Sequence, residues 1–395
     1  MSARRLKIAF VAAEPSGDWQ AGALAQAIAD SGADAEMCGV GGSCMEKAGV
    51  KVWLNSQDVS CIGPGDALGR IPYFYASYFK LKSYLKQMRP DITVMLDSPA
   101  LNMRLARFLR LQDLRSLYYI PPSAWTTSAK RLRSIHQRTD GVVCIFRPNA
   151  ERYAELGLKV GYFGHPIVDM YSLDSQSPEE ARRELGTDKP VLAVLPGSRR
   201  QEVDNLLPRF VDIAELFLAE HPEAEALIPC ATEALHEKIG RYLGEDHPKI
   251  KAVLGHTRQA LRIARVALTA SGSATLEAAM CGVPMAICYR FGMVNWVLGR
   301  ALILAGLLRV EHFGLPNLVA ESRICPELLQ HEVCPEMLMP ILRELWDDTP
   351  RRAQMVADLA KVREALGQPG VLRRVAHAVV SMAEGMTLAE AVERA

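Results

Sequence analysis

Short apolar runs alternate with amphipathic helical patterns along most of the chain. The first run covers residues 7–12, and a turn and a helical pattern follow it to about residue 30. Compact apolar runs of this kind are typical of strands that a parallel sheet buries on both faces. The same pattern predicts further strands at 92–96, 116–120, 141–145 and 159–163. Because each of them follows helical material, the first part of the chain is expected to form repeated βαβ units.

A polar segment at 173–190 interrupts this pattern, and its composition indicates a linker or surface segment. A second series of predicted strands follows at 191–195, 226–229, 251–254, 266–270 and 284–288. The chain is also too long for one ordinary core. We therefore expect an α/β protein with two Rossmann-like parallel-sheet lobes, 1–172 and 173–349, and a cleft between them. The pattern leaves open whether the helical tail of about 350–395 packs back on the first lobe.

Composition narrows the function classes. Of the 395 residues 49% are apolar and 23% are charged, and the formal net charge of +1 gives no argument for nucleic acid binding. The nine cysteines are scattered without a C-x-x-C pair, which favours a reduced cytoplasmic protein over a disulfide framework or a zinc site. The first apolar run ends at Glu14, unlike a signal peptide, and the most apolar region contains Asn295 and Arg300. We therefore expect no helix that spans a membrane.

The predicted strand at 191–195 leads into a loop that suits a phosphate group. Gly197 allows the backbone to approach a ligand closely, and Ser198 can cap the next helix or donate to phosphate. Arg199 adds a planar cation that can hold a diphosphate through two hydrogen bonds. Taken alone, these residues fit an ordinary strand-to-helix turn with a solvated arginine equally well.

A second loop of this kind ends the predicted strand at 266–270. Small residues gather there at the start of a helical pattern, namely Ser271, Gly272, Ser273 and Thr275. Backbone N–H groups at a helix start attract anions, and Glu277 near the first turn can reach a ribose diol. A capped helix with an exposed glutamate is the alternative. Because two such loops end strands of one lobe, we expect a nucleotide-sized anion site there.

In the first lobe, polar residues follow two predicted strands at the edge where α/β proteins bind ligands. The turn after the first strand contains Glu14, Ser16, Gly17 and Asp18. Asp97 ends the strand at 92–96, where packing gives no reason for a carboxylate. Capping of the following helices is the alternative for these polar side chains.

The residues of these loops resemble those of the lipid-A-disaccharide synthases. The matching segments are Glu14-Pro-Ser-Gly-Asp18, Phe163-Gly-His165-Pro, Leu195-Pro-Gly-Ser-Arg199, Ser271-Gly-Ser-Ala-Thr-Leu-Glu277, Leu315-Pro-Asn317-Leu and Glu327-Leu-Leu-Gln330. They occur in the family's order, and the resemblance runs from residue 8 to about residue 335. It implies the GT-B fold and an inverting glycosyltransferase that joins two acylated glucosamines. The donor would be a UDP-activated acylated glucosamine and the acceptor an acylated glucosamine 1-phosphate, with no cofactor and no metal.

The resemblance also implies roles for residues. Asp97 is the expected catalytic base, which takes the proton of the acceptor 6-hydroxyl as that oxygen attacks the anomeric carbon of the donor. Arg199 is expected to hold the UDP phosphates and Glu277 the ribose. The other residues expected at the donor are Gly197, Ser198, Ser271, Gly272, Ser273, Thr275, Asn317 and Gln330. The residues expected on the acceptor side are Glu14, Ser16, Gly17, Asp18, Asn102, Ser123, Trp125 and His165, although His165 fits a role in fixing the turn between the lobes equally well.

Three first-lobe segments depart from the family pattern. The family pattern Asp-x-Pro-Asp-Phe-Asn corresponds here to Asp97-Ser-Pro-Ala-Leu-Asn102. Pro-Ser-x-Trp-Ala-Trp-Arg corresponds to Pro122-Ser-Ala-Trp-Thr-Thr-Ser128, and Pro-Phe-Glu to Pro148-Asn-Ala150. Ala13 also replaces the glycine before Glu14. All of these lie on the acceptor side, so the donor is indicated more firmly than the acceptor.

The segment 71–86 combines six aromatic residues with Lys80, Lys82 and Lys86. Such a segment suits contact with a membrane surface, here the cytoplasmic face of the inner membrane, and it equally suits a partly buried core helix.

Other functions stay open at this point. A GT-B enzyme with another acceptor, a UDP-sugar epimerase, and a non-catalytic relative that binds a nucleotide sugar or glycolipid all fit the second-lobe loops. An NAD(P)-dependent dehydrogenase is disfavoured, because no G-x-G-x-x-G follows the first strand. The oligomeric state is also open, a homodimer included.

Overall fold

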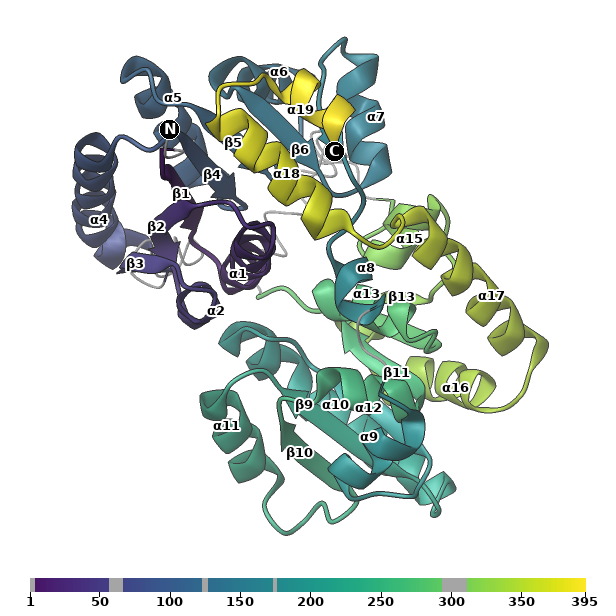
Figure 1. The fold of residues 1–395 in the computed structure, drawn as a ribbon. Coiled ribbons are helices and arrows are strands. Elements are labelled where there is room, and N and C mark those ends of the chain that lie inside the picture. Colours follow the sequence, from purple (N-terminus) through teal and green to yellow (C-terminus); the bar gives the residue numbers. More distant parts are fainter. Residues whose placement is uncertain (1–3, 57–66, 123–126, 173–175, 293–310) are drawn as a thin grey trace. The chain divides into compact units, whose positions relative to one another are not determined.

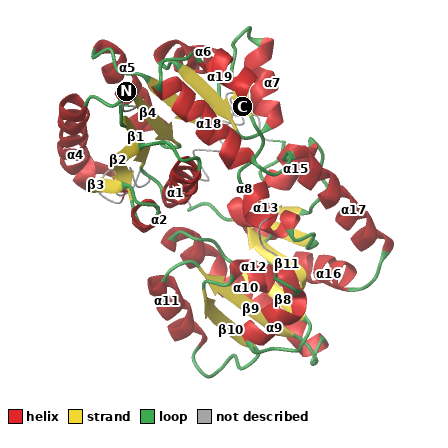
Figure 2. Cartoon of the chain, viewed as in Figure 1, coloured by secondary structure: helices red, strands yellow, loops and turns green. Residues whose placement is uncertain are grey.

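The structure, a computed structural model, describes residues 4–56, 67–122, 127–172, 176–292 and 311–395, without the side chains of 15 and 67–73. It divides the chain into two compact units, Met1–Asp169 with Leu366–Ala395, and Met170–Ala365. Helices alternate with strands in both units, as the apolar pattern predicts (Figure 2). The C-terminal segment that returns to the first unit begins at Leu366, whereas the pattern allowed for a return from about residue 350.

The first unit contains a parallel sheet with the strand order β3-β2-β1-β4-β5-β6-β7 (Figure 1). Its strands are β1 (Leu6–Ala12), β2 (Ala35–Gly41), β3 (Lys51–Asn55), β4 (Ile92–Leu96), β5 (Ser116–Tyr119), β6 (Gly141–Cys144) and β7 (Gly161–Tyr162). Its helices are α1 (Pro15–Asp30), α2 (Ser43–Lys47), α4 (Ala67–Met88), α5 (Pro99–Leu111), α6 (Ala129–Arg138), α7 (Arg147–Glu155), α18 (Val371–Ala383) and α19 (Leu388–Arg394), and α8 (Ile167–Ser172) crosses the boundary to the second unit. The strand order reverses between β1 and β4, because β2 and β3 extend the sheet on one side of β1 and the later strands on the other.

Apolar side chains cover both faces of this sheet. On one face, Phe10 of β1 lies in a core cluster with Val375 and Val379 of α18. On the other face, Val11 of β1 lies in a cluster with Leu105 of α5. Successive strand residues point to opposite faces, so a strand that is buried on both sides reads as one continuous apolar run.

The returning segment is tied to the end of the first segment within the first unit. The backbone N–H of His165 donates to the carbonyl of Leu366 at 2.7 Å. The buried carboxylate of Asp169 accepts the backbone N–H groups of residues 370–372 at 2.5–3.2 Å and so caps the start of α18. The two places where the chain passes between the units are therefore joined by hydrogen bonds.

The second unit contains a parallel sheet with the order β10-β9-β8-β11-β12-β13. Its strands are β8 (Val191–Leu195), β9 (Glu225–Cys230), β10 (Ile250–Leu254), β11 (Ala264–Ala270), β12 (Met285–Tyr289) and β13 (Glu327–Leu329). Its helices are α9 (Pro178–Leu185), α10 (Arg200–Glu220), α11 (Glu233–Leu243), α12 (Thr257–Ile263), α13 (Ser273–Met280), α15 (Leu315–Ala320), η1 (Gln330–Glu332), α16 (Pro335–Trp346) and α17 (Pro350–Ala365). Here the order reverses between β8 and β11. None of the helices within the described ranges of either unit has the length and apolar character to cross a bilayer.

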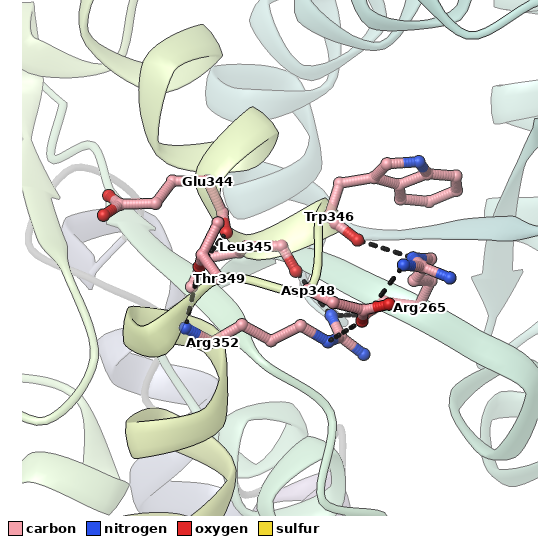
Figure 3. A network of polar contacts seen from close by, with 7 residues as sticks. All are labelled: Arg265, Glu344, Leu345, Trp346, Asp348, Thr349 and Arg352. Carbon is pink, nitrogen blue, oxygen red and sulfur yellow. Dashed lines mark hydrogen bonds and ion pairs between the residues drawn. The ribbon is translucent and has the colours of Figure 1, made fainter.

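Two arginines fasten the turn between α16 and α17 to the sheet of the second unit (Figure 3). Arg265 of β11 donates to the carbonyl of Trp346 at 2.5 Å and pairs with Asp348 at 3.2 Å. Arg352 of α17 donates to the carbonyl of Arg265 at 2.7 Å and also to that of Leu345. These contacts hold α17 in the second unit.

Replacing Arg352 by Ala is expected to lower the free energy of unfolding of the second unit by about 2 kcal/mol, because two carbonyls lose a charged donor. Thermal unfolding of the full chain measures this. Lys361→Ala is the matched control on the same helix, since Lys361 is exposed and pairs only across one helical turn with Asp358. Its effect should stay within about 0.5 kcal/mol. Equal losses in the two variants would show that the Arg352 contacts are not important.

Candidate active site

The two polar turns of the first unit meet at one edge of its sheet. β1 and β4 are parallel neighbours, with Ala12 opposite Leu96. The turn at 14–18 follows β1 and Asp97 follows β4, so both leave the carboxyl ends of strands at the point where the strand order reverses. Ligands of open α/β sheets bind at such a reversal. The structure thus brings Asp97 next to the residues predicted from the first turn.

Asp97 is held in an unusual backbone conformation. Asp97 and Ser98 have φ values of +48° and +34°, and the left-handed region costs a non-glycine residue about 1–3 kcal/mol. The peptide carbonyl of Asp97 accepts hydrogen bonds from Asn102 at 2.7 Å and from the Tyr118 hydroxyl at 2.6 Å. Burial, and to a lesser degree the charge of Asp97, raises the pKa of Tyr118, so its hydroxyl stays protonated and donates. The Ser16 hydroxyl donates to the Asp97 carboxylate at 3.3 Å, which sets that carboxylate at the first turn of α1.

Two residues predicted on the acceptor side have structural roles. The buried carboxylate of Asp18 accepts the backbone N–H groups of residues 42, 44 and 45 at 2.5–3.3 Å and caps α2. Asn102 is fully buried, and its amide donates to the carbonyls of Leu96 and Asp97 at 2.9 and 2.7 Å. Buried polar groups need such partners, and both side chains therefore hold the backbone around the two turns in position. Their predicted contact with the acceptor stays a prediction.

The other residues of the first turn lie where a ligand can reach the strand ends. Glu14 is the N-cap residue of α1, and Ser16 is exposed. An added Cβ at Gly17 would lie 3.4 Å from the Asp97 carboxylate. The absence of a side chain at Gly17 thus keeps room beside that carboxylate.

The two predicted phosphate loops of the second unit also lie side by side. β8 and β11 are parallel neighbours, with Leu195 opposite Thr269. The loop at 197–199 follows β8 and the loop at 271–273 follows β11, so both leave the same edge at the reversal of the strand order. Gly197 has a φ of +119°, which glycine adopts readily, and an added Cβ at Gly272 would meet no atom within 4 Å. Both loops therefore place backbone N–H groups at the starts of α10 and α13, which is the arrangement of an anion site, and at Gly272 the backbone is open.

Glu202, which the sequence pattern did not single out, occupies the donors of the first of these loops. Its carboxylate accepts the backbone N–H groups of Ser198 at 3.2 Å and of Arg199 at 3.3 Å. The Arg199 guanidinium donates to the same carboxylate at 3.1 Å. Its position three residues after Arg199, on the first turn of α10, was the available signal.

Contacts of the second loop orient it within the unit. The Ser271 hydroxyl donates to the carbonyl of Phe313 at 2.7 Å, and the buried Thr275 hydroxyl to that of Gly272 at 2.7 Å. Ser273 is the first residue of α13 and is exposed. Ser271 and Thr275 therefore shape the loop, whereas Ser273 is open to a ligand.

Glu277 lies in a small polar cluster on α13. The Tyr171 hydroxyl donates to its carboxylate at 3.1 Å, and the Arg258 guanidinium lies over the Tyr171 ring at 5.2 Å. Burial raises the pKa of Glu277, against the opposing effects of Tyr171 and Arg258. A partly buried carboxylate with one hydroxyl donor can exchange that donor for a ligand diol.

Comparison with known proteins identifies the family. The model of the lipid-A-disaccharide synthetase family matches residues 8–380. The chain belongs to this family. Among curated members, the lipid-A-disaccharide synthase of Myxococcus xanthus is 32% identical over 378 residues, covering 95% of this chain and 97% of that protein. That of Chromobacterium violaceum is 31% identical over 384 residues, covering 96% and 97%.

Comparison with solved structures shows that this chain has the GT-B fold. A putative UDP-N-acetylglucosamine 2-epimerase from Listeria monocytogenes superposes with a TM-score of 0.66 at 13% identity, covering 96% of each chain. The glycotransferase of kitacinnamycin superposes with a TM-score of 0.60 at 16% identity, covering 96% of this chain and 99% of that one. At these identities the likeness concerns the fold alone, and the two parallel-sheet units agree with it.

The synthase resemblance placed Asn317 and Gln330 at the donor, and the structure gives both a local partner. Asn317 is fully buried, and its amide bonds with the backbone of Cys325 and with the Glu327 carboxylate at 2.8–2.9 Å. Gln330 exchanges two hydrogen bonds with the backbone of Phe291, at 3.2 and 3.3 Å. Asn317 therefore joins α15 to β13, and Gln330 holds the segment after β12; their contact with the donor stays a prediction.

His165 is likewise buried, in the first unit. Its Nδ1 accepts the backbone N–H of Ile167 at 3.1 Å, and its ring packs on Phe146 at 5.0 Å. Burial lowers its pKa to about 3, so the ring stays neutral near neutral pH. The role of fixing the turn, one of the two alternatives for His165, fits these contacts. Ser123 and Trp125 lie outside the described residues.

A cavity of about 540 Å³ adjoins the 197–199 loop. The motifs shared with the synthases do not indicate this cavity. It lies between α10 and α11, and its basic lining residues are Arg200, Lys238 and Arg241, beside Ser198. Within the ranges that the structure describes, no group of three His, Cys, Asp or Glu side chains could hold a metal ion.

Replacing Glu277 by Gln is expected to stabilise the chain near neutral pH and to weaken UDP binding. The folded-state pKa of Glu277 is raised, so this group's contribution to stability is present at low pH and is lost as the pH rises through that pKa. The variant should lose this dependence above the ordinary pKa of a glutamate, and unfolding is therefore followed from acidic to neutral pH. Unfolding midpoints across that range and UDP titration measure the two effects. Glu237→Gln is the control, because its side chain is 70% exposed; equal pH profiles in both variants would contradict the assignment.

Proposed function

We propose that the chain transfers a 2,3-diacylglucosamine from UDP to the 6-hydroxyl of an acylated glucosamine 1-phosphate. Family membership supports this reaction, and the two loops at the reversal of the second sheet support a UDP site. The observation that carries the proposal is the strained Asp97, whose carbonyl is fixed by Asn102 and Tyr118. Backbone strain of this kind persists where the surrounding structure enforces it, and it gathers at functional sites.

In the proposed reaction Asp97 acts as the general base. Its carboxylate takes the proton of the acceptor 6-hydroxyl while that oxygen forms a bond to the anomeric carbon. The bond from this carbon to the UDP oxygen breaks, and UDP leaves with the electron pair. Attack from the face opposite UDP inverts the anomeric centre, so an α-linked donor gives a β-linked product. The Ser16 hydroxyl keeps the carboxylate at the start of α1.

The donor binds in the proposal to the second unit. The Arg199 guanidinium and the N–H groups of the loops at 197–199 and 271–273 hold the diphosphate and stabilise the charge on departing UDP. Glu277 accepts hydrogen bonds from the ribose hydroxyls in place of Tyr171. The proposal thus assigns the donor to the second unit and the base to the first.

The departures from the family pattern bear on the acceptor. Leu101 is fully buried in the core beside the sheet, so the change from Phe there concerns packing. Ala100, the second residue of α5, is exposed. The family pattern has an aspartate at this position, so a carboxylate is missing from that surface. Asn149 is buried. The acceptor side therefore lacks the charged family residues at three positions, Ala100, Ser128 and Ala150, which leaves the acyl pattern of the acceptor as the property most open to change.

Asp97→Asn is expected to lower the transfer rate by about 10²–10⁴-fold with UDP affinity unchanged, because only the base is lost. Arg199→Ala should lower both the rate and UDP affinity, the latter about tenfold or more. Mass spectrometry of products from the acylated UDP-glucosamine and acylated glucosamine 1-phosphate checks the reaction. The exposed Asp34 gives the control variant Asp34→Asn. Parental rates in Asp97→Asn would refute the base, and an isomerised UDP-sugar in place of a disaccharide would favour an epimerase.

Contact with the cytoplasmic face of the inner membrane is the second part of the proposal. On α4, Leu81 and Leu85 are buried in the core, whereas Tyr75 and Phe79 are 41% and 61% exposed. Lys82 lies over the Phe79 ring at 5.4 Å, so apolar and cationic groups share this surface. Such a face can rest among lipid headgroups and receive acylated substrates.

Replacing Tyr75 and Phe79 by Ser is expected to reduce flotation with anionic liposomes severalfold, since about 0.8 kcal/mol is lost per buried methylene equivalent. Their exposure makes both changes tolerable for the fold. Tyr242→Ser is the matched control, because this tyrosine is 44% exposed on the second unit. Equal flotation of the parent and the double variant, or none for either, would remove this part of the proposal.

A further inference from the structure

The Glu202 carboxylate accepts hydrogen bonds from the same groups that would donate to the proposed diphosphate. The carboxylate is 15% exposed and accepts three hydrogen bonds from the 197–199 loop, two from backbone N–H groups and one from the Arg199 guanidinium. The loop also closes tightly around it, because an added Cβ at Gly197 would lie 2.6 Å from Glu202. An anionic group of the chain itself therefore fills this turn.

The same donors cannot serve Glu202 and a diphosphate together. Each backbone N–H is a single donor, and two anions at one turn repel each other. The two backbone contacts, at 3.2 and 3.3 Å, are longer than the common 2.9–3.0 Å for such bonds, so they are easily exchanged. Phosphate oxygens that approach the Ser198 and Arg199 amides must displace the carboxylate.

The starts of two other helices show how the hydrogen bonds of Glu202 differ from those of an ordinary helix cap. Glu180 accepts the backbone N–H of Ser177 at 2.7 Å at the start of α9, and Glu390 that of Thr387 at 2.8 Å at the start of α19. In both, the hydroxyl of the N-cap residue accepts the backbone N–H of the glutamate in turn. In α10 the glutamate instead accepts from two successive N–H groups and from a guanidinium, which is the donor set of an anion site.

We propose that the Glu202 carboxylate is an internal competitor of the UDP diphosphate. It occupies the 197–199 loop when the donor is absent, leaves when the diphosphate binds, and returns as UDP departs. Glu202 thereby weakens the binding of product UDP and speeds its release. This inference rests on the proposed function, because it assigns the loop to a diphosphate.

UDP and uridine binding to the full chain, measured by calorimetry, tests the competitor. Glu202→Gln removes the charge with little change of shape, so UDP should bind about five- to tenfold more tightly, as expected when a larger fraction of the protein is competent to bind. Uridine carries no phosphate, and its affinity should stay unchanged. Glu180→Gln alters the comparable cap of α9 and should change neither affinity.

A second variant separates competition from support of the fold. Glu202→Ala removes the cap as well as the charge and should still bind UDP more tightly than the parent. Weaker or unchanged UDP binding in both Glu202 variants would overturn the proposal and make Glu202 a support of the loop. If Arg199→Ala also left UDP affinity unchanged, the donor site itself would be wrong, whereas a loss in Arg199→Ala alone would overturn only the competitor.

Discussion

The proposed chemistry depends on two parallel strand pairs, β1 with β4 and β8 with β11. In each sheet the strand order reverses at this pair. The connections that follow the two strands therefore run in opposite directions, and neither covers the loops at the strand ends. The pairing brings Asp97 to the turn at 14–18, and the 197–199 loop to the 271–273 loop. Residues that are far apart in the sequence become neighbours because their strands are hydrogen-bonded neighbours.

Around both reversals, hydrogen bonds from neighbouring side chains hold the candidate site residues in position. Asn102 and Tyr118 fix the carbonyl of Asp97, and Tyr171 orients the carboxylate of Glu277. Asn317 does the same for the turn into β13 through Glu327. Residues of a family motif are thus of two kinds. Some can contact a ligand, and others keep the ligand-contacting residues in position. A motif read from sequence alone does not separate them.

The apolar runs predicted the strands on both sides of each reversal, because strands buried on two faces must be continuously apolar. They missed β2, where Gly39 and Gly41 interrupt the run, β3, whose apolar run covers only Val52–Leu54, and β13, which has only three residues. The roles of Asp18 and Asn317 could not be read either, since each is decided by partners from another element of the chain. Glu202 was missed because a glutamate on a first helical turn is usually an ordinary cap.

The composition of the first unit from two chain segments has a consequence for synthesis at the ribosome. Its sheet lacks the α18 cover on one face until the last thirty residues or so have emerged, whereas the second unit is complete at Ala365. Domains fold as units in the order in which their residues appear. The first unit is therefore completed after the second, because α18 has to be made before its core on that face is filled.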